Sequence, residues 1–178
     1  MNHRLDNDKQ VFFYENEFYV LSNFSSFQVR MWDSITFPTV EHAYQWKKFD
    51  WSPSLIPQGP RLATNLNSSS LEKLRSEILR APSAHEAFRI AQSKRHYRNP
   101  YWDSLKEGIM LDLCVTKFFQ HEYVQVKLFE TGDRELIEDS WRDDVWGWGP
   151  NKDGQNLLGK VWMKIRNEFR KGPPPERG

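Results

Sequence analysis

The sequence has very little cysteine and no long apolar run. Of its 178 residues only Cys114 is a cysteine, so an internal disulfide is excluded. A single thiol is typical of proteins in a reducing compartment, which predicts a cytoplasmic protein with Cys114 as a small core residue. No uninterrupted apolar run approaches the ~18 residues that span a bilayer, and the polar first residues contain no apolar signal-peptide core. The sequence therefore predicts no membrane partner.

An excess of charge of one sign is missing as well. The chain has 25 basic and 24 acidic residues, for a formal net charge of +1 at pH 7. A protein that coats nucleic acid is more basic than this, so any contact with nucleic acid is expected to be local.

Three familiar kinds of catalytic motif are also absent. None of the five histidines stands at zinc-ligand spacing from another or from Cys114, so the sequence predicts no metal site and no cofactor. There is no Gly-x-Ser-x-Gly nucleophile elbow and no Walker phosphate loop. Acid-base chemistry by carboxylates is what remains.

Aromatic residues, by contrast, are abundant. They make up 15% of the chain and include 8 tryptophans, more than a core requires, which indicates a pocket that binds a flat ring. A carboxylate next to an anomeric carbon can break a glycosidic bond, and aromatic side chains can stack on a ring-like leaving group. Residues of the required kinds are present, although sequence positions alone do not bring them together. They are Glu41, Asp143, Trp102 and Trp146.

The segment from Thr39 to Phe49 is predicted to be a helix on which the rest of the chain is organised. Thr39 is a good N-cap, because its hydroxyl can accept a hydrogen bond from a free first-turn N–H. Glu41 then falls in the first turn, where the helix dipole favours a carboxylate. The residues themselves leave two roles open for Glu41, a capping group or a working acid or base.

The hydrophobic pattern predicts a mainly α fold, a single multihelical domain with a small N-terminal antiparallel β-sheet. Residues 11–171 are expected to form this domain, with residues 1–10 as a flexible N-terminus and 172–178 as a disordered Pro-rich tail. Strands are predicted at 11–14, 18–21, 27–30 and 35–37, and 136–138 is either a strand or a final turn. Helices are predicted at 39–50, 71–80, from a Ser83 cap to 93, from an Asn99 cap to 119, at 122–129 and at 157–170.

Two further segments are predicted to be loops. Residues 51–69 contain prolines and small polar residues and form a long loop. Residues 140–156 combine three Trp, three Gly and three Asp, which suits a functional loop better than a core strand.

Several motifs occur together in an order that resembles one known family. The most specific are Thr39-Val40-Glu41-His42 followed by Gln45, joined to Trp146-Gly147 and to Gly154-Gln155-Asn156-Leu157-Leu158-Gly159. Leu21-Ser22-Asn23-Phe24 and Lys117-Phe118 fit the same pattern. Over about residues 11–170 the chain resembles the NADAR family, the YbiA-like N-glycosidases.

The resemblance implies a mainly helical fold and hydrolysis of an N-glycosidic bond. Two substrates are associated with the family: ADP-ribose attached to guanine, in a nucleoside or in nucleic acid, and the phosphorylated aminopyrimidine ribosides of riboflavin biosynthesis. We favour the first, so the expected partner is a small-molecule or nucleic-acid-linked ADP-ribose, with a phosphoribosyl substrate as the alternative. By the resemblance, Glu41 is the catalytic carboxylate, Asp143 assists it, and Trp102 and Trp146 line the pocket. The implied polar contacts to sugar or phosphate are Asn23, Gln45, Lys48 and Asn156.

The chain departs from the family at one place that concerns phosphate. Family members often carry a Gly-Arg pair shortly before the tryptophan at 102, where this chain has Ala91-Gln92. Lys94 or Arg95 could supply the missing cation, which makes Lys48 and the run Lys94–Arg98 candidate phosphate ligands. The run could equally be a solvated charged face.

Two alternatives of other classes stay open from the sequence. A non-catalytic module that binds ADP-ribose or a nucleotide would use the same pocket, with Glu41 as a capping group only. An interaction domain with a Trp-rich core would bury Trp102 and Trp146 with no adjacent cavity.

Overall fold

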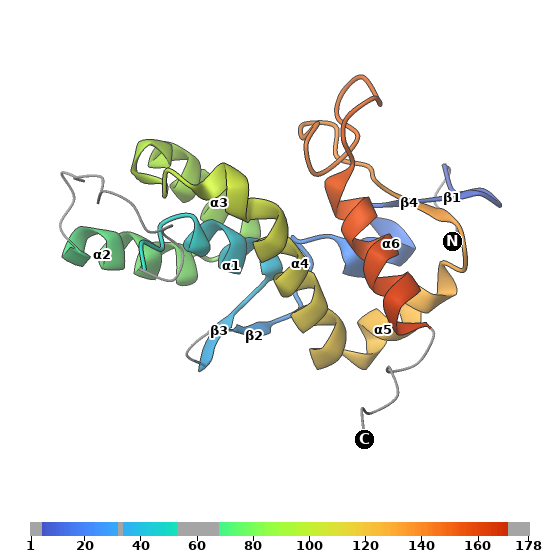
Figure 1. The fold of residues 1–178 in the computed structure, drawn as a ribbon, viewed down its shortest axis with the longest axis horizontal. Coiled ribbons are helices and arrows are strands. Elements are labelled where there is room, and N and C mark those ends of the chain that lie inside the picture. The colour runs from blue at the N-terminus through green and yellow to red at the C-terminus, as the bar shows by residue number, and fades with distance from the viewer. Residues whose placement is uncertain (1–4, 32–33, 53–67, 171–178) are drawn as a thin grey trace. The chain divides into compact units, whose positions relative to one another are not determined.

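The computed structural model describes residues 5–31, 34–52 and 68–170 (Figure 1). The chain forms two compact units. The central unit comprises residues 26–113, and the terminal unit comprises residues 1–25 and 114–178. Helix α4 begins in the central unit and ends in the terminal unit.

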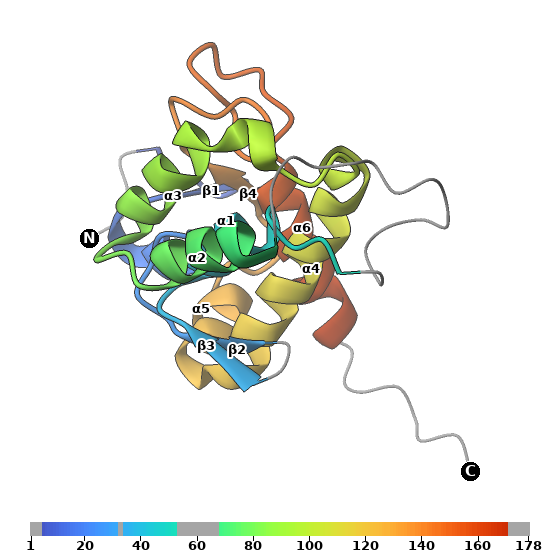
Figure 2. The same cartoon turned by 90° about the vertical axis from the view of Figure 1, so that its left-hand side faces the viewer.

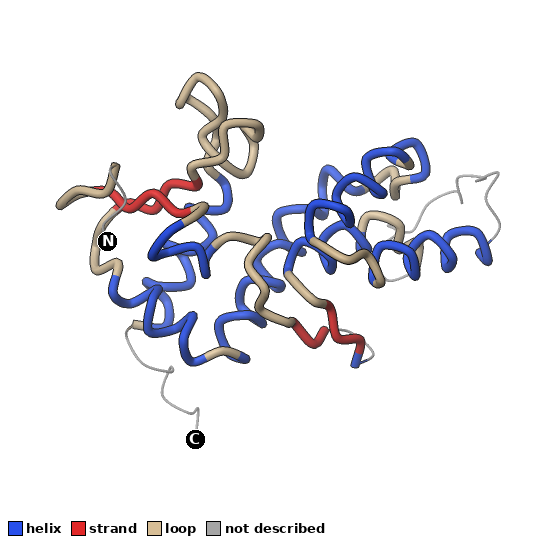
Figure 3. Tube along the Cα trace, turned by 180° about the vertical axis from the view of Figure 1, so that it is seen from behind, coloured by secondary structure: helices blue, strands red, loops and turns tan. Residues whose placement is uncertain are grey.

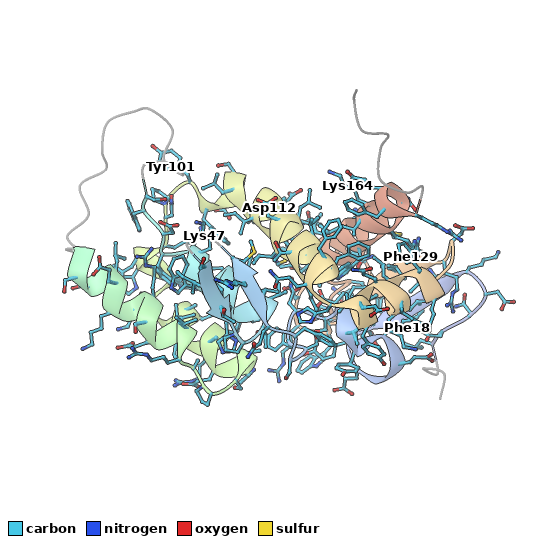
Figure 4. The ribbon with its side chains drawn as sticks, turned by 90° about the horizontal axis from the view of Figure 1, so that it is seen from below. Phe18, Lys47, Tyr101, Asp112, Phe129 and Lys164 are labelled. Carbon is cyan, nitrogen blue, oxygen red and sulfur yellow. The ribbon has the colours of Figure 1, made fainter. Side chains whose placement is uncertain are left out.

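The terminal unit combines a short parallel pair of strands with helices. Strands β1 and β4 pair in parallel, with Val11 opposite Leu136 (Figure 3). Helix α6 packs on β4, and α5 packs on the 3-10 helix η1, whose Phe18 is labelled with Phe129 of α5 in Figure 4. The elements are β1 (Gln10–Phe13), η1 (Asn16–Leu21), α5 (Glu122–Glu130), β4 (Glu135–Glu138) and α6 (Leu157–Phe169).

The central unit is mainly helical. Strands β2 and β3 form an antiparallel pair with Arg30 opposite Thr36. Helices α1, α2 and α3 pack against one another (Figure 2). The elements are β2 (Val29–Met31), β3 (Ile35–Phe37), α1 (Val40–Lys47), α2 (Ser68–Leu79), α3 (Ala84–Ser93), the 3-10 turn η4 (Arg95–Tyr97) and the start of α4 (Trp102–Gln120).

The predicted mainly α fold is confirmed, and so are most helices. The Ser83 hydroxyl accepts a hydrogen bond from the Glu86 N–H at 3.1 Å and begins α3 as predicted. Residues 136–138 belong to strand β4. The predicted antiparallel pairing holds for β2 and β3, whereas β1 pairs in parallel with β4.

The strand predicted at 18–21 is wrong, because these residues lie in η1. Aromatic and β-branched residues favour strands only when a neighbouring strand is available for pairing. Here Phe18, Val20 and Leu21 instead bury their side chains from a 3-10 helix. The composition of the segment therefore predicts that its apolar side chains are buried, but it does not predict the backbone conformation.

Other predictions fall wholly or mostly outside the described residues. These are most of the loop 51–69 and the tail 172–178. The domain boundaries stay predictions. Within the described residues, no helix combines the length and the apolar character needed to cross a bilayer.

Candidate active site

Helix α1 begins as the sequence predicts and is buried throughout. The Thr39 hydroxyl accepts a hydrogen bond from the His42 N–H at 3.2 Å, and all eight residues of α1 are buried. Glu41, in the first turn, is only 5% exposed. A carboxylate is costly to bury unless polar groups contact its charged form, so its surroundings decide whether it is ionised.

Gln45 is one of the polar groups that contact this carboxylate. Its Nε2 donates a hydrogen bond to Glu41 Oε1 at 2.6 Å, across one turn of α1. This contact fixes the amide orientation, since the flipped amide would place two oxygens together. The Gln45 Oε1 is buried and has no hydrogen-bond partner among the described residues. A buried acceptor of this kind is costly, and a ligand hydroxyl could satisfy it.

Lys48 and Trp102, two further predicted site residues, lie together on a neighbouring part of the unit. The Lys48 ammonium lies 4.9 Å from the centre of the Tyr44 ring and 5.9 Å from that of Trp102. Tyr44 and Trp102 contact each other edge to face, with ring centres 5.0 Å apart. The aromatic faces stabilise the cation, so α1 and the start of α4 are linked through it.

An open pocket of about 360 Å³ lies beside Lys48. It brings together three of the predicted phosphate ligands, namely Lys48, Arg95 and Arg98, with Gln92 among the other lining residues. Lys94 is not one of the lining residues. Trp102 is 2% exposed and does not line this pocket itself.

His42 holds the start of α1 in a way that depends on its charge. Its Nε2 lies 3.1 Å from the Ala81 carbonyl oxygen, which can only accept, and its Nδ1 lies 2.8 Å from the Thr39 hydroxyl. The ring therefore donates from Nε2, and in its neutral form it can accept a hydrogen bond from the Thr39 hydroxyl at Nδ1. Burial lowers the pKa of His42, and the hydrogen bond to Ala81 opposes this in part.

We expect acid to destabilise the protein through His42. The unfolded chain takes up a proton at this histidine below about pH 6.5, and the folded chain, with the lower pKa, does not. The free energy of unfolding should therefore decrease as pH falls from 7 towards 5. Denaturant unfolding at a series of pH values measures this, and a His42→Gln variant should show a shallower decrease. A His96→Gln variant, changed at an exposed histidine, should keep the wild-type slope; equal slopes for all three proteins would contradict the expectation.

Asn23 lies in a loop of the terminal unit that a buried lysine holds. Lys117 is fully buried, and its ammonium donates hydrogen bonds to the Ser22 carbonyl at 2.9 Å and to the Ser25 hydroxyl at 2.7 Å. Burial lowers the pKa of Lys117 to about 7.

The neighbouring Cys114 is buried, as predicted for a core residue. Burial raises the pKa of its thiol to about 12, so the thiol is not a nucleophile at neutral pH.

The loop at 139–156 holds the other predicted site residues. Asp143 Oδ1 accepts hydrogen bonds from the backbone N–H groups of Val145 and Trp146, both at 2.9 Å. The Asn156 amide accepts from the Glu138 N–H at 3.0 Å and donates to the Leu136 carbonyl at 2.8 Å. Asn156 thus joins the start of α6 to strand β4, and one oxygen of Asp143 caps a turn.

The predicted site residues therefore fall into two sets. The central unit holds Glu41, Gln45, Lys48 and Trp102, and the terminal unit holds Asn23, Asp143, Trp146 and Asn156. Trp102 and Trp146 are both buried, as the interaction-domain alternative expected, but a pocket does lie beside Lys48. Among the described residues, no three His, Cys, Asp or Glu side chains cluster as metal ligands would.

Two residues named in the sequence, Asn99 as a helix cap and Lys117 as part of a motif, have supporting contacts that the sequence did not predict. Asn99 is fully buried, and its N–H and side-chain amide donate to the carbonyls of Lys48 at 2.7 Å and Asp50 at 2.9 Å. Lys117 is the other, and here a signal was present. It follows Cys114 by three residues and precedes the buried Phe118, so it lies on the apolar face of α4, where a charged residue is unusual.

Comparisons with known proteins agree with these observations. The family model described as NADAR domain matches residues 12–170. The N-glycosidase Npun_R5314 of Nostoc punctiforme is 32% identical, and the match covers 90% of this chain and 92% of that protein. The riboflavin biosynthesis protein VVA0006 of Vibrio vulnificus is 28% identical, with 94% of this chain but 40% of that protein covered.

A solved structure extends the similarity to the fold. The NMR structure of the E. coli protein YbiA matches with a TM-score of 0.73 at 27% identity, covering 98% of this chain and 94% of that one. Because the family model spans most of the chain and the fold agrees, the chain belongs to the NADAR family and is an N-glycosidase, a hydrolase of N-glycosyl bonds.

Proposed function

We propose that the protein hydrolyses the N-glycosidic bond between ADP-ribose and guanine and releases ADP-ribose. The observation that carries the proposal is the buried Glu41 carboxylate, held by Gln45 at 2.6 Å in the first turn of α1. A positioned carboxylate can accept a proton from water or stabilise positive charge on the sugar ring as the bond to the base breaks. Because relatives in this family are named N-glycosidases, we favour a catalytic role over a module that only binds ADP-ribose.

In the proposed reaction, water adds its oxygen to the anomeric carbon while the bond from that carbon to the guanine nitrogen breaks. Glu41 acts on the water or on the charged ring, and the electron pair of the broken bond leaves with guanine, which takes up a proton. The buried Gln45 Oε1 is suited to accept a hydrogen bond from a sugar hydroxyl. Roles for Asn23, Asp143, Trp102, Trp146 and Asn156 stay predictions.

A second candidate substrate is a phosphorylated aminopyrimidine riboside. The relative VVA0006 carries the name of a riboflavin biosynthesis protein, which favours this alternative. The chemistry at the anomeric carbon is the same, because both leaving groups are flat nitrogen bases. Only the part of the substrate beyond the sugar differs.

A side-by-side assay decides between the two substrates. The purified protein is incubated with ADP-ribosylated guanosine, with DNA carrying the same adduct and with the aminopyrimidine riboside phosphate, and the products are separated by mass spectrometry. Release of ADP-ribose at the higher kcat/KM supports the proposal. Faster release of ribose 5-phosphate supports the alternative, and no release of either sugar contradicts both.

A further inference from the structure

The pocket beside Lys48 has a composition that predicts the charge of its ligand. Two guanidinium groups and one ammonium line it, from Arg95, Arg98 and Lys48. The volume of about 360 Å³ lies at the small end of the range of about 300–1,000 Å³ found for ligand sites. Gln92 adds an amide, and none of the described residues that line the pocket carries a carboxylate. Such a pocket suits a small anion.

The backbone segments that carry these cations are tied together before any ligand arrives. Asn99 ties the connection between η4 and α4 to the carbonyls of Lys48 and Asp50, at 2.7 and 2.9 Å. The Trp51 indole N–H donates to the Tyr97 carbonyl at 3.3 Å, which adds a third link between the same two walls. The end of α1 and the turn η4 are therefore fixed to each other, so the backbone positions of the cationic residues are set.

The ion pairs already present leave cationic charge in the pocket. Arg98 contacts Asp103 at 2.9 Å, but both side chains are well exposed, and such surface pairs contribute little. Arg95 has no ion-pair partner among the described residues. Its planar guanidinium can donate two hydrogen bonds to one phosphate group, which an ammonium cannot match in geometry.

We propose that this pocket binds the phosphate group on the sugar of the substrate, and that Arg95 supplies its main cation. Ala91 and Gln92, which also line the pocket, carry no charge, so the cationic charge on this side comes from Arg95 in the following turn. Glu41 and Lys48 are seven residues apart, roughly 10 Å along a helix, a span that a ribose with its 5′-phosphate can bridge between extended side chains. The identity of the ligand rests on the proposed function.

Binding of sugar phosphates tests the proposal without any bond being broken. Wild-type protein is titrated calorimetrically at low salt with ribose 5-phosphate, with ADP-ribose and with unphosphorylated ribose. The wild type should bind both phosphorylated sugars more tightly than ribose. An Arg95→Gln variant should bind them about 10- to 100-fold more weakly, as expected for the loss of hydrogen bonds from a charged donor.

The matched control is Lys94→Gln, which removes one charge from the neighbouring residue that does not line the pocket. It should bind like the wild type, and circular dichroism should show that both variants are folded. Wild-type affinity in Arg95→Gln would overturn the proposal, as would an equal loss in Lys94→Gln or equal binding of ribose and ribose 5-phosphate by the wild type. The preferred sugar phosphate identifies the source of the phosphate group.

The two proposals fail in different ways. If the protein cleaves neither substrate but Arg95→Gln still loses sugar-phosphate binding, the result supports the phosphate pocket and contradicts the proposed reaction. In the opposite case, cleavage depends on Glu41 while Arg95→Gln leaves both the Kd of the sugar phosphates and the KM of the substrate unchanged. That result supports the proposed reaction and contradicts the phosphate pocket.

Discussion

Replacing Glu41 with glutamine should lower kcat by about two to four orders of magnitude, the usual contribution of a positioned acid or base. Glutamine has the shape of glutamate, but it cannot accept a proton from water or stabilise positive charge on a sugar ring. The hydrogen bond from Gln45 Nε2 to position 41 can still form, because an amide oxygen also accepts. The variant should therefore remain folded and should bind substrate, so that the loss appears mainly in kcat.

Two companion variants sharpen this test. Glu77→Gln changes an exposed glutamate of α2 in the same unit, and it should have wild-type kcat. Glu41→Asp keeps the charge but withdraws it by one methylene group, so its kcat should lie between those of wild type and Glu41→Gln. A folded Glu41→Gln protein with full activity, checked by circular dichroism and thermal unfolding, would remove Glu41 from the mechanism.

Replacing Gly159 with alanine should destabilise the protein by about 3 kcal/mol or more, the upper range for overpacking a core. A Cβ atom at Gly159 would lie 2.0 Å from the Leu136 carbonyl oxygen and 2.6 Å from Asn156 Oδ1. The Leu136 contact is with backbone of β4, which cannot rotate away as a side chain can. Helix α6 would have to move off the strand, and this would also disturb the hydrogen bonds of Asn156.

Thermal and denaturant unfolding measure this effect, with Gly108→Ala as the control. Gly108 is a helical glycine of α4 that is exposed and has nothing within 4 Å of its would-be Cβ. Alanine there should stabilise the protein by about 0.5–1 kcal/mol, because glycine is a poor helix former. For Gly159→Ala we expect a Tm lower by roughly 6–12 °C in a protein of this size. An unchanged Tm would mean that α6 and β4 pack less closely than described.

Local signals in the sequence were sufficient for most helices and for the start of α1. Thr39 and Ser83 each precede a helix and cap it through the side-chain oxygen, so both helix starts could be predicted from a few neighbouring residues. The pairing of β1 with β4 could not, because it joins Val11 to Leu136 across most of the chain. Nothing in either strand specifies a partner so distant.

The candidate site shows the same division. The contact between Glu41 and Gln45, to which we assign the proposed chemistry, could be predicted because the two residues lie one helical turn apart. The 2.6 Å hydrogen bond agrees. The assembly of Lys48 with Arg95 and Arg98 depends on Asn99 reaching the carbonyls of Lys48 and Asp50, far away in sequence. The sequence predicts Asn99 only as a helix cap. Its hydrogen bonds to the Lys48 and Asp50 carbonyls are visible only in the fold.

The parallel pairing of Val11 with Leu136 has a consequence for how the chain is made. The terminal unit needs residues from both ends of the chain, whereas the central unit is continuous from residue 26 to 113. During synthesis the central helices can form and pack as soon as they leave the ribosome, while β1 must wait until β4 has been translated. We therefore expect the amides of α1 and α3 to become protected from hydrogen exchange before those of β1 in a refolding experiment, since contacts distant in sequence form slowly.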